Sequence, residues 1–407
     1  MPPAAPAAGR WRPVHDALVT SDEFENQVNQ LTSVGYLQGY HAAPSDRGVT
    51  VHDPDRAHDG LNLYTSGHAP EAAIMDMQGR VLHRWTYDFA DLQHTEKVDL
   101  SNPFKRESTT HWRRVHLCDN GDLLAIFDSL YLIRLGSDSN LKWRSPMPGF
   151  HHHMQVAEDG VIYALVAGTT TVPGRREGMV LDSIAVLSPD GKVIRIHSLL
   201  KCFLNSSYMH MLEGFENRPE LFHTNTLQLL DGTQAHVSPV FAKGRVLVSM
   251  LYLNAIAVLD LERMTVVWAL DGSEDKLWNG MHEPVLLDSG RVLIFDNNWD
   301  DPGIRSESRV IEFDPFIRQI AWKYEGSSDR PFYSRTCGTN QRLPNGNTLI
   351  TESDIGRAFE VTRDGDVVWE YVNPHRAGKS GELIATLLHV TRIEADSVGW
   401  LAAHGQR

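Results

Sequence analysis

The sequence predicts an all-β protein, a six-bladed β-propeller with a short N-terminal helical arm. Three observations lead to this prediction. One phrase that ends in an apolar strand repeats six times, and a second phrase of strand, turn and strand also repeats six times. After about residue 60 the apolar segments are short, rich in β-branched residues and separated by Asp-Gly, Asn-Gly or Ser-Gly turns. We therefore expect an arm over residues 1–60 and a propeller over residues 61–407.

The first phrase is a turn followed by an apolar strand that ends in Trp or an equivalent residue. Successive copies lie about 47 to 72 residues apart. This interval suits one propeller blade of four strands. The six copies are MQGRVLHRW to Trp85, SDSNLKW to Trp143, SPDGKVIRI to Ile196, LERMTVVW to Trp268, DPFIRQIAW to Trp322 and TRDGDVVW to Trp369.

The second phrase alternates with the first, so each repeat carries two hairpins and makes one four-stranded blade. We expect the ring to close where the two chain ends complete one shared blade, because closure removes exposed sheet edges. A β-sandwich array or a solenoid is the alternative, although regular units of blade length fit a ring better. The copies are HLCDNGDLLAIF, MQVAEDGVIYALV, a looser LQLLDG…GRVLVSM, VLLDSGRVLIFD, QRLPNGNTLITE and a degenerate TRIEADSVGWLAA.

The arm contains one readable helix. Thr20 and Glu23 have the spacing of a capping box, and Phe24, Val28 and Leu31 follow at helical intervals. Two roles for this arm are compatible with the sequence, namely covering the central funnel of the ring and packing against another subunit. The sequence does not determine the oligomeric state.

Cysteine usage and the N-terminal residues indicate the compartment. Cys118, Cys202 and Cys337 are an odd number of cysteines without a C-x-x-C pair, which favours a reducing environment. The N-terminus lacks a basic segment followed by an apolar one, and no run reaches about 18 apolar residues. We expect a cytoplasmic protein that does not enter a membrane.

Charge bears on the class of partner. The formal net charge is −14, and an acidic surface repels phosphate backbones. Nucleic acid is therefore not an expected partner. Hydrophobic residues make up 42% of the chain, which is enough for a sizeable core.

Histidines gather where the second phrase begins. The chain has 20 histidines. When the copies of the second phrase are aligned at their turns, four blades each carry one polar residue at the same position of the inner strand. Imidazoles that converge from separate strands can form a metal cage or a nucleophile with acid and base partners. The aligned residues are His152, Asn225, His282 and His389, with His151, His153 and His223 beside them and His111 and Arg113 in the related stretch of another blade.

At these residues the chain resembles the bacterial arylsulfotransferase (ASST) family. The resemblance implies a six-bladed propeller in which a central histidine attacks an aryl sulfate, becomes sulfated and passes the sulfuryl group to a phenol. Other histidines and an arginine hold the sulfuryl oxygens, and no diffusible cofactor is needed. The matching phrases, in order, are GVTVHDPDRAHDGLNLYTSGHAPEAAIMDMQGRVLHRW, DSIAVLSPDGKVIRI, ELFHTNTLQLLDG, GMHEPVLLDSGRVLIFDNNW, SRVIEFDP and QRLPNGNTLITESDIGRAFEVTRDGDVVWEY.

The resemblance also implies roles for individual residues. Met281-His282-Glu283 matches the family phrase that holds the nucleophile, so His282 is the candidate nucleophile. His223-Thr224-Asn225 matches the family's His-x-Asn phrase, and His151-His152-His153 matches its His-His-Asp phrase. We expect His282, His223 and His152 to be catalytic. Asn225, Arg113 and His389 are expected to bind a small substrate, which the resemblance implies is aromatic.

Two residues depart from the family pattern. His153 stands where the family usually carries Asp, and Leu251 stands where its sulfuryl-binding arginine falls. An aliphatic side chain cannot hold a sulfate oxygen, and losing such a contact typically costs about 3–4 kcal/mol of transition-state stabilisation. Arg113, Arg305 and Arg335 are candidates to replace it from other blades.

These departures leave a second hypothesis open. Losing an arginine and gaining a histidine suits a divalent transition metal, because imidazole is the usual ligand of iron, copper and zinc. A metal-dependent oxidoreductase or lyase acting on a small organic metabolite would use His152, His153, His223 and His282 as ligands. A third class is a propeller that only binds other proteins, since fold does not fix function.

Overall fold

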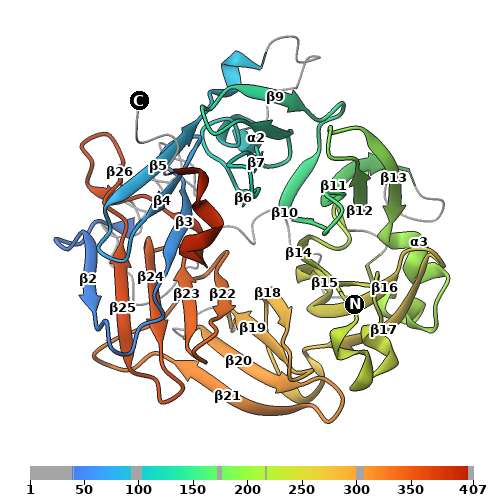
Figure 1. Ribbon diagram of the computed structural model, residues 1–407. Coiled ribbons are helices and arrows are strands. Elements are labelled where there is room, and N and C mark those ends of the chain that lie inside the picture. The colour runs from blue at the N-terminus through green and yellow to red at the C-terminus, as the bar shows by residue number, and fades with distance from the viewer. Residues whose placement is uncertain are drawn as a thin grey trace, which may run out of the picture.

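The computed structural model describes residues 39, 41–92, 103–171, 177–215, 218–298 and 307–401. Within these residues the protein is all-β and resembles a propeller. Several sheets stand around a common centre (Figure 1). The strands of their sheets that lie nearest to it are β6 (Arg114–Leu117), β10 (Phe150–Val156), β14 (Thr224–Leu229), β18 (Met281–Leu286) and β22 (Thr339–Arg342). This confirms the all-β, propeller-like part of the predicted fold class. The helix expected near residues 20–31 lies outside the described residues.

Four sheets are each built from four consecutive antiparallel strands, in the order expected for two hairpins per repeat. The first sheet is β6 (Arg114–Leu117), β7 (Leu123–Ile126), β8 (Leu132–Leu135) and β9 (Leu141–Arg144), and the second is β10 (Phe150–Val156), β11 (Ile162–Thr170), β12 (Met179–Leu187) and β13 (Val193–Ser198). The third is β14 (Thr224–Leu229), β15 (Val246–Met250), β16 (Ala255–Asp260) and β17 (Thr265–Asp271), and the fourth is β18 (Met281–Leu286), β19 (Val292–Asp296), β20 (Arg309–Asp314) and β21 (Gln319–Glu325).

One sheet combines segments from distant parts of the chain. Its inner strand β28 (Leu387–Ile393) pairs with β3 (Leu61–Ser66), which continues into β4 (Glu71–Met75) and β5 (Val81–Thr86). Val390 lies opposite Tyr64 in this antiparallel pair. The sheet therefore joins the two ends of the repeat region, as the expected ring closure requires.

A five-stranded sheet includes a strand from the predicted arm. β22 (Thr339–Arg342), β23 (Thr348–Glu352), β24 (Arg357–Val361) and β25 (Val367–Val372) follow one another, and β2 (Gly48–His52) pairs with β25. The predicted boundary after residue 60 thus lies beyond a segment that belongs to this sheet. A small sheet is formed by β1 (His41–Ala42), β27 (Leu383–Ile384) and β26 (Arg376–Ala377).

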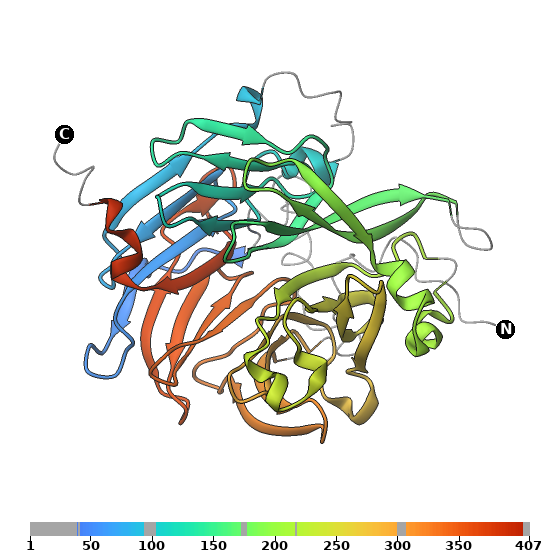
Figure 2. The same cartoon turned by 45° about the vertical axis from the view of Figure 1, so that its right-hand side comes forward.

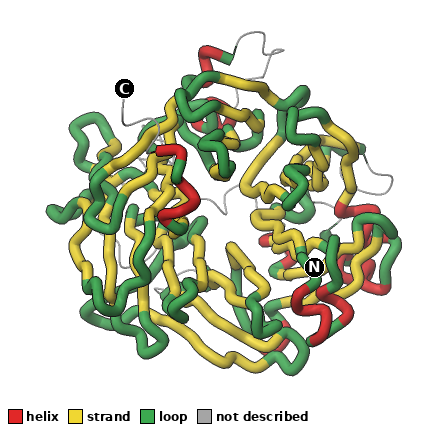
Figure 3. The backbone as a smooth tube through the Cα atoms, in the orientation of Figure 1, coloured by secondary structure: helices red, strands yellow, loops and turns green. Residues whose placement is uncertain are grey.

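Among the described residues, the helical segments are short and lie between strands, except the last one, which follows β28 (Figure 3). None of those described combines the length and apolar character needed to cross a bilayer. Ser198 caps α3 because its hydroxyl accepts the Lys201 amide at 3.3 Å. The segments are η1 (Phe89–Asp91), α2 (Pro103–Glu107), α3 (Leu199–Leu204), η2 (Ser207–Leu212), η3 (Thr233–His236), η4 (Pro239–Phe241), η5 (Leu251–Leu253), η6 (Glu274–Lys276) and η7 (Ala395–Val398).

The recurrent tryptophans connect neighbouring sheets. The indole N–H of Trp143 on β9 donates to the Pro189 carbonyl at 3.1 Å, in the turn between β12 and β13. Trp322 and Trp369 make the same kind of bond to the next sheet, at 2.8 and 2.9 Å. The turn must carry glycine where the ring approaches, since a Cβ on Gly191 would lie 2.6 Å from the Trp143 ring. At this position the Trp143 ring and the Asp190-Gly191 turn therefore form one contact.

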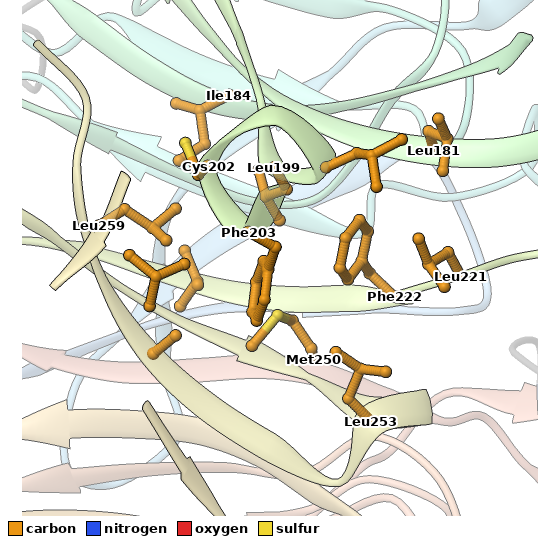
Figure 4. Close-up of a cluster of buried hydrophobic side chains, with 14 of the residues drawn as sticks. Leu181, Ile184, Leu199, Cys202, Phe203, Leu221, Phe222, Met250, Leu253 and Leu259 are labelled. Carbon is orange, nitrogen blue, oxygen red and sulfur yellow. The ribbon is translucent and has the colours of Figure 1, made fainter. Parts of the chain in front are cut away.

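The largest hydrophobic cluster lies between the β10–β13 and β14–β17 sheets, where α3 also packs. Phe203 of α3 and Phe222, just before β14, have ring centroids 5.5 Å apart (Figure 4). Phe222 is fully buried immediately before His223, so this packing anchors a candidate site residue. In the same region the long β11–β12 hairpin projects beyond the other sheets (Figure 2).

Candidate functional site

The predicted site residues lie at the beginnings of the inner strands. His152 and His153 are in the first half of β10, His282 is the second residue of β18, and His389 is the third of β28. His223 directly precedes β14. Arg113 and Asn225 occupy comparable positions, immediately before β6 and in β14.

The inner strands are irregular at these residues. The register shifts between Phe150 and Met154 in β10, and β14, β18 and β28 have shifts near their own starts. His152, His223 and Glu283 have positive φ angles of 50°, 49° and 48°. Non-glycine residues rarely adopt this conformation, and bulges redirect side chains that would otherwise alternate across the sheet. The bulges therefore decide where these imidazoles point.

Two of the predicted catalytic histidines are neighbours. The rings of His152 and His223 have centroids 5.0 Å apart and meet edge to face. Nδ1 of His152 lies 2.9 Å from Nδ1 of His151, so one of these nitrogens donates to the other. Burial and the nearby Arg113 charge hold the pKa of His152 well below its usual value. His152 is therefore a neutral hydrogen-bonding group at pH 7.

The pKa of His223 is shifted in the opposite direction from that of His152. Its Nδ1 lies 3.0 Å from Oε1 of Glu220. Burial opposes the charged form, but the charges of Glu220, Asp182 and Asp128 outweigh it and raise the pKa of His223. His223 is thus the member of the pair that is suited to carry a proton.

Leu251 contributes nothing to this group of side chains. It is buried in the hydrophobic cluster that also contains Trp278 and Met281. The next residue, Tyr252, instead places its ring centroid 4.9 Å from that of His223. The position that carries arginine in the family is therefore a core residue in this chain.

His282 is held by an amide whose orientation is determined by its other bonds. The Asn297 side-chain nitrogen donates to the carbonyls of Ser334 and Cys337, both at 2.8 Å. Its oxygen is therefore the atom that faces Nδ1 of His282, at 2.7 Å. An oxygen can only accept, so Nδ1 carries the proton and Nε2 keeps its lone pair.

The protonation state of His282 agrees with this tautomer. Burial lowers the pKa of His282 to about 3, and the Arg113 charge acts in the same direction. The imidazole is therefore neutral at pH 7. No described residue forms a hydrogen bond with Nε2, so the lone pair is available to a reactant.

Arg113 is a buried cation whose charge acts on several of these histidines. The side chain is 7% exposed. Its charge contributes to the lowered pKa values of His152, His282 and His389, after burial as the larger cause in each case. A guanidinium in this position favours a negatively charged ligand. Of the other candidates, Arg335 donates its backbone amide to the Asp354 carboxylate at 2.7 Å, and Arg305 lies outside the described residues.

The sequence pattern did not identify an ion pair that joins β6 to β18. Arg114 contacts Glu283 through two hydrogen bonds of 2.6 and 3.1 Å. Nε2 of His153 lies 2.6 Å from the same guanidinium and 3.5 Å from the Glu283 carboxylate. Although Glu283 is buried, Arg114 and His153 hold its pKa well below the usual value. His153 therefore belongs to a buried charge network.

The side chain of Asn225 forms hydrogen bonds with other groups of the protein. Its amide nitrogen donates to the Met281 carbonyl at 2.7 Å, and its oxygen accepts the Ser249 hydroxyl. The amide thus ties β14 to β18, and its expected contact with substrate stays a prediction. His389 is 6% exposed, and its Nδ1 is buried without a partner.

The arrangement does not favour the metal hypothesis. Among the described residues, one group of three potential ligands has its donor atoms within 4.8 Å of one another, namely His68, Glu71 and His375. His152, His153, His223 and His282 do not form such a group. The Arg114 guanidinium beside His153 would also repel a cation.

Other residues of the site were missed by the sequence reading. Glu220, Asn297 and Arg114 bind His223, His282 and His153 from positions that no repeated phrase marks. Each nevertheless carried a signal, since Arg114 lies next to Arg113 in the stretch aligned with the inner strands, and Glu220 and Asn297 lie inside phrases that match the family.

Comparison with solved structures found matches of low sequence identity. A protein of unknown function from Bacteroides caccae has 13% identity over 82% of this chain and 98% of its own, with a TM-score of 0.49. Hydrazine synthase from Kuenenia stuttgartiensis has 10% identity over 88% of this chain and 99% of its own, with a TM-score of 0.46. Virginiamycin B lyase from Staphylococcus aureus has 10% identity over 85% of this chain and 94% of its own, with a TM-score of 0.43. No protein with a curated description matches the chain.

The match to a family model is more informative. The model described as arylsulfotransferase (ASST) matches residues 78–374. This range includes β6, β10, β14 and β18, and with them most of the histidines described above. Because the match spans well over half of the chain, this protein belongs to the arylsulfotransferase (ASST) family.

Proposed function

We propose that the protein transfers a sulfuryl group from an aryl sulfate to a phenol, through a sulfo-histidine formed on His282. The observation that carries this proposal is the contact between His282 and Asn297. It makes Nδ1 the protonated nitrogen and leaves Nε2 with a free lone pair. A neutral imidazole with a fixed tautomer is a competent nucleophile.

In the first step, Nε2 of His282 attacks the sulfur atom, and the bond from sulfur to the aryl oxygen breaks. The electron pair of that bond leaves with the aryl oxygen. The His282 ring becomes a sulfo-imidazolium, whose Nδ1–H still donates to the Asn297 oxygen. This hydrogen bond strengthens as the ring gains positive charge, so it stabilises the intermediate more than the free enzyme.

His223 supplies the proton for the leaving oxygen. Its pairing with Glu220 favours the imidazolium form, and a protonated phenol leaves more readily than a phenolate. In the second step the acceptor phenol gives its proton back to neutral His223, its oxygen attacks sulfur, and the bond from nitrogen to sulfur breaks. His223 and His282 then return to their initial states.

Arg113 and His152 bind the sulfuryl oxygens in this proposal. Arg113 supplies the positive charge that the family's arginine would supply from position 251. His152, which is neutral, donates a hydrogen bond. Donors already in place where charge develops are typically worth about 3–4 kcal/mol each. Neither step requires a metal or a diffusible cofactor.

The proposal also includes the number of blades, the class of substrate and the cellular location. Five sheets of four strands and one of five, each with an inner strand, support a count of six blades. A single catalytic centre on the axis of the ring would then draw residues from most blades. A small aromatic substrate is expected there, and a cytoplasmic location stays part of the proposal.

A half-reaction tests the proposal. The wild-type protein and H282A are mixed with an aryl sulfate in the absence of an acceptor, and released phenol is measured against enzyme. Wild type should release one equivalent in a burst and then stop until a phenol is added. Folded wild-type protein that releases no phenol from several aryl sulfates, or an H282A variant that keeps the burst, would refute it.

A further inference from the structure

A second cluster of ligand-type side chains lies outside the group of histidines described above. His68 is in the turn between β3 and β4, Glu71 begins β4, and His375 follows β25. One nitrogen from each imidazole and one carboxylate oxygen lie within 4.8 Å of one another. Nε2 of His68 is 3.1 Å from Oε1 of Glu71.

The two imidazoles have hydrogen-bonding capacity that the protein does not use. Nδ1 of His68 and Nε2 of His375 are buried and have no hydrogen-bond partner. The rings stack with centroids 3.4 Å apart and planes inclined by 9°. Two imidazolium rings would repel each other strongly at this distance, so at least one ring is neutral and offers a lone pair. A buried polar nitrogen without a partner is costly, and a bound cation would remove this cost.

The loops that carry the three residues are held in place by backbone contacts. The amide of Gly67, next to His68, donates to the Thr386 carbonyl at 2.9 Å. The His375 carbonyl accepts the Ala385 amide at 3.1 Å. Both loops are thus attached to the connection that leads into β28. Because the backbone of both loops is already held, only side chains need to move when a metal binds, which limits the loss of conformational entropy.

We propose that His68, Glu71 and His375 bind one divalent transition-metal ion, and that Zn²⁺ suits this donor set best. Two imidazole nitrogens and one carboxylate oxygen are a common ligand set for zinc, with bonds of about 2.0–2.2 Å. Tetrahedral bonds of this length place ligand atoms about 3.4 Å apart. The cluster reaches this spacing if the stacked rings turn so that both lone pairs point at one ion. Water would take the fourth position, because the His68 and Glu71 side chains are 16% and 13% exposed.

Arg84 occupies the place of the cation when no metal is bound. Its guanidinium pairs with Oε1 of Glu71, the oxygen that also faces His68. The Arg84 side chain is 36% exposed, so it can turn toward solvent when an ion binds. Arg84 is therefore a competitor of the metal. Replacing it with a neutral residue should strengthen metal binding.

The experiment is calorimetric titration of the untagged, chelator-treated protein with Zn²⁺, with Co²⁺ absorption as a second readout of the ligand geometry. Wild type should bind one equivalent at this site. H68A and H375A should each lower the affinity for Zn²⁺ at least about tenfold. E71Q should also lower the affinity, and this variant removes no buried ring. R84Q should raise the affinity several-fold. H210A removes an exposed histidine on η2 and should have no effect.

This inference does not depend on the proposed reaction. H282A and H223A should lose activity and keep the bound equivalent, whereas H375A should bind the ion at least about tenfold more weakly. The proposal is overturned if wild type binds no Zn²⁺ in the micromolar range. It is also overturned if H68A, H375A and E71Q, with the thermal stability of wild type, bind as wild type does, or if the equivalent disappears in H282A instead.

Discussion

The side-chain oxygen of Asn297 lies 2.7 Å from Nδ1 of His282, and the Asn297 nitrogen donates to two backbone carbonyls. The amide therefore has one orientation, and the histidine has one tautomer. Asn297 directly follows β19, the strand that pairs with the His282 strand. The hairpin β18–β19 thus carries both the proposed nucleophile and the group that orients it.

Replacing Asn297 with alanine should slow sulfuryl uptake by about 10²-fold or more, because either nitrogen of His282 can then carry the proton and the sulfo-imidazolium loses its acceptor. Single-turnover release of phenol measures this step. N298A, which changes the adjacent amide, is the control. Equal rates for N297A and wild type would show that the tautomer does not matter. The melting temperature of N297A must be measured as well, because the Ser334 and Cys337 carbonyls lose their donor.

The donor half-reaction should depend on pH through His223. This residue must be protonated to assist the leaving oxygen, and the Glu220 charge raises its pKa. The rate should therefore be highest at lower pH and fall as pH rises through that raised pKa. E220Q removes the charge, so the fall should move to lower pH, by about one unit for each 1.4 kcal/mol of lost interaction. A profile that is identical in E220Q and wild type would argue against His223 as the acid.

Arg113 should matter for the charged donor. R113M is expected to lower kcat/KM for an aryl sulfate by about 10²–10³-fold, and the pKa of His152 and His282 should rise because a positive neighbour is removed. Histidine titration by NMR reports the second effect directly. R80M changes an exposed arginine whose side chain is 78% exposed and should leave both properties unchanged. If R113M behaves like R80M, another group must hold the sulfuryl oxygens.

Restoring the family's arginine at its aligned position should fail. Leu251 is 4% exposed within a hydrophobic cluster, so L251R buries a charge without a partner. The free energy of unfolding should drop by roughly 3–5 kcal/mol, which denaturant titration measures. L251M is the matched control and should cost less than about 1.5 kcal/mol. A stable L251R variant with higher sulfuryl transfer would mean that this position faces the substrate.

The ion pair between Arg114 and Glu283 should stabilise the fold in a pH-dependent manner. The folded-state pKa of Glu283 lies well below its ordinary value, so its contribution is present above the unfolded pKa of about 4.3. It should be lost as pH falls from that value through the folded pKa. R114M leaves the carboxylate buried without a partner and should cost about 3–5 kcal/mol at pH 7. Urea unfolding of R114M and wild type at pH 7 and pH 4 should show a difference that narrows in acid.

The sequence predicted the fold well because each repeat has a physical cause. The phrases that end in Trp143, Trp322 and Trp369 recur because each indole bonds to a turn of the next sheet. The pairing of β2 with β25 was not predicted, since Gly48–His52 carries neither repeated phrase and its partner lies more than 300 residues away in the chain.

The site was predicted in part. The repeat alignment located His152, His282 and His389 on inner strands, because equivalent strand positions face the same axis. It could not assign partners, because bulges at His152 and Glu283 break the two-residue alternation of side chains. Glu220 and Asn297 act from loops and strand ends, where no periodicity identifies a contact. The distances that define the acid and the nucleophile arise only in the folded chain.

In the proposed reaction His282 carries the sulfuryl group. The most direct measurement is mass spectrometry of the intact protein after reaction with an aryl sulfate, followed by mapping of the modified residue under alkaline conditions. We expect a mass increase of one sulfuryl group on His282 that disappears when a phenol is added and does not form in H282A. An unmodified protein that still transfers sulfuryl groups, or a label on another residue that persists in H282A, would contradict it.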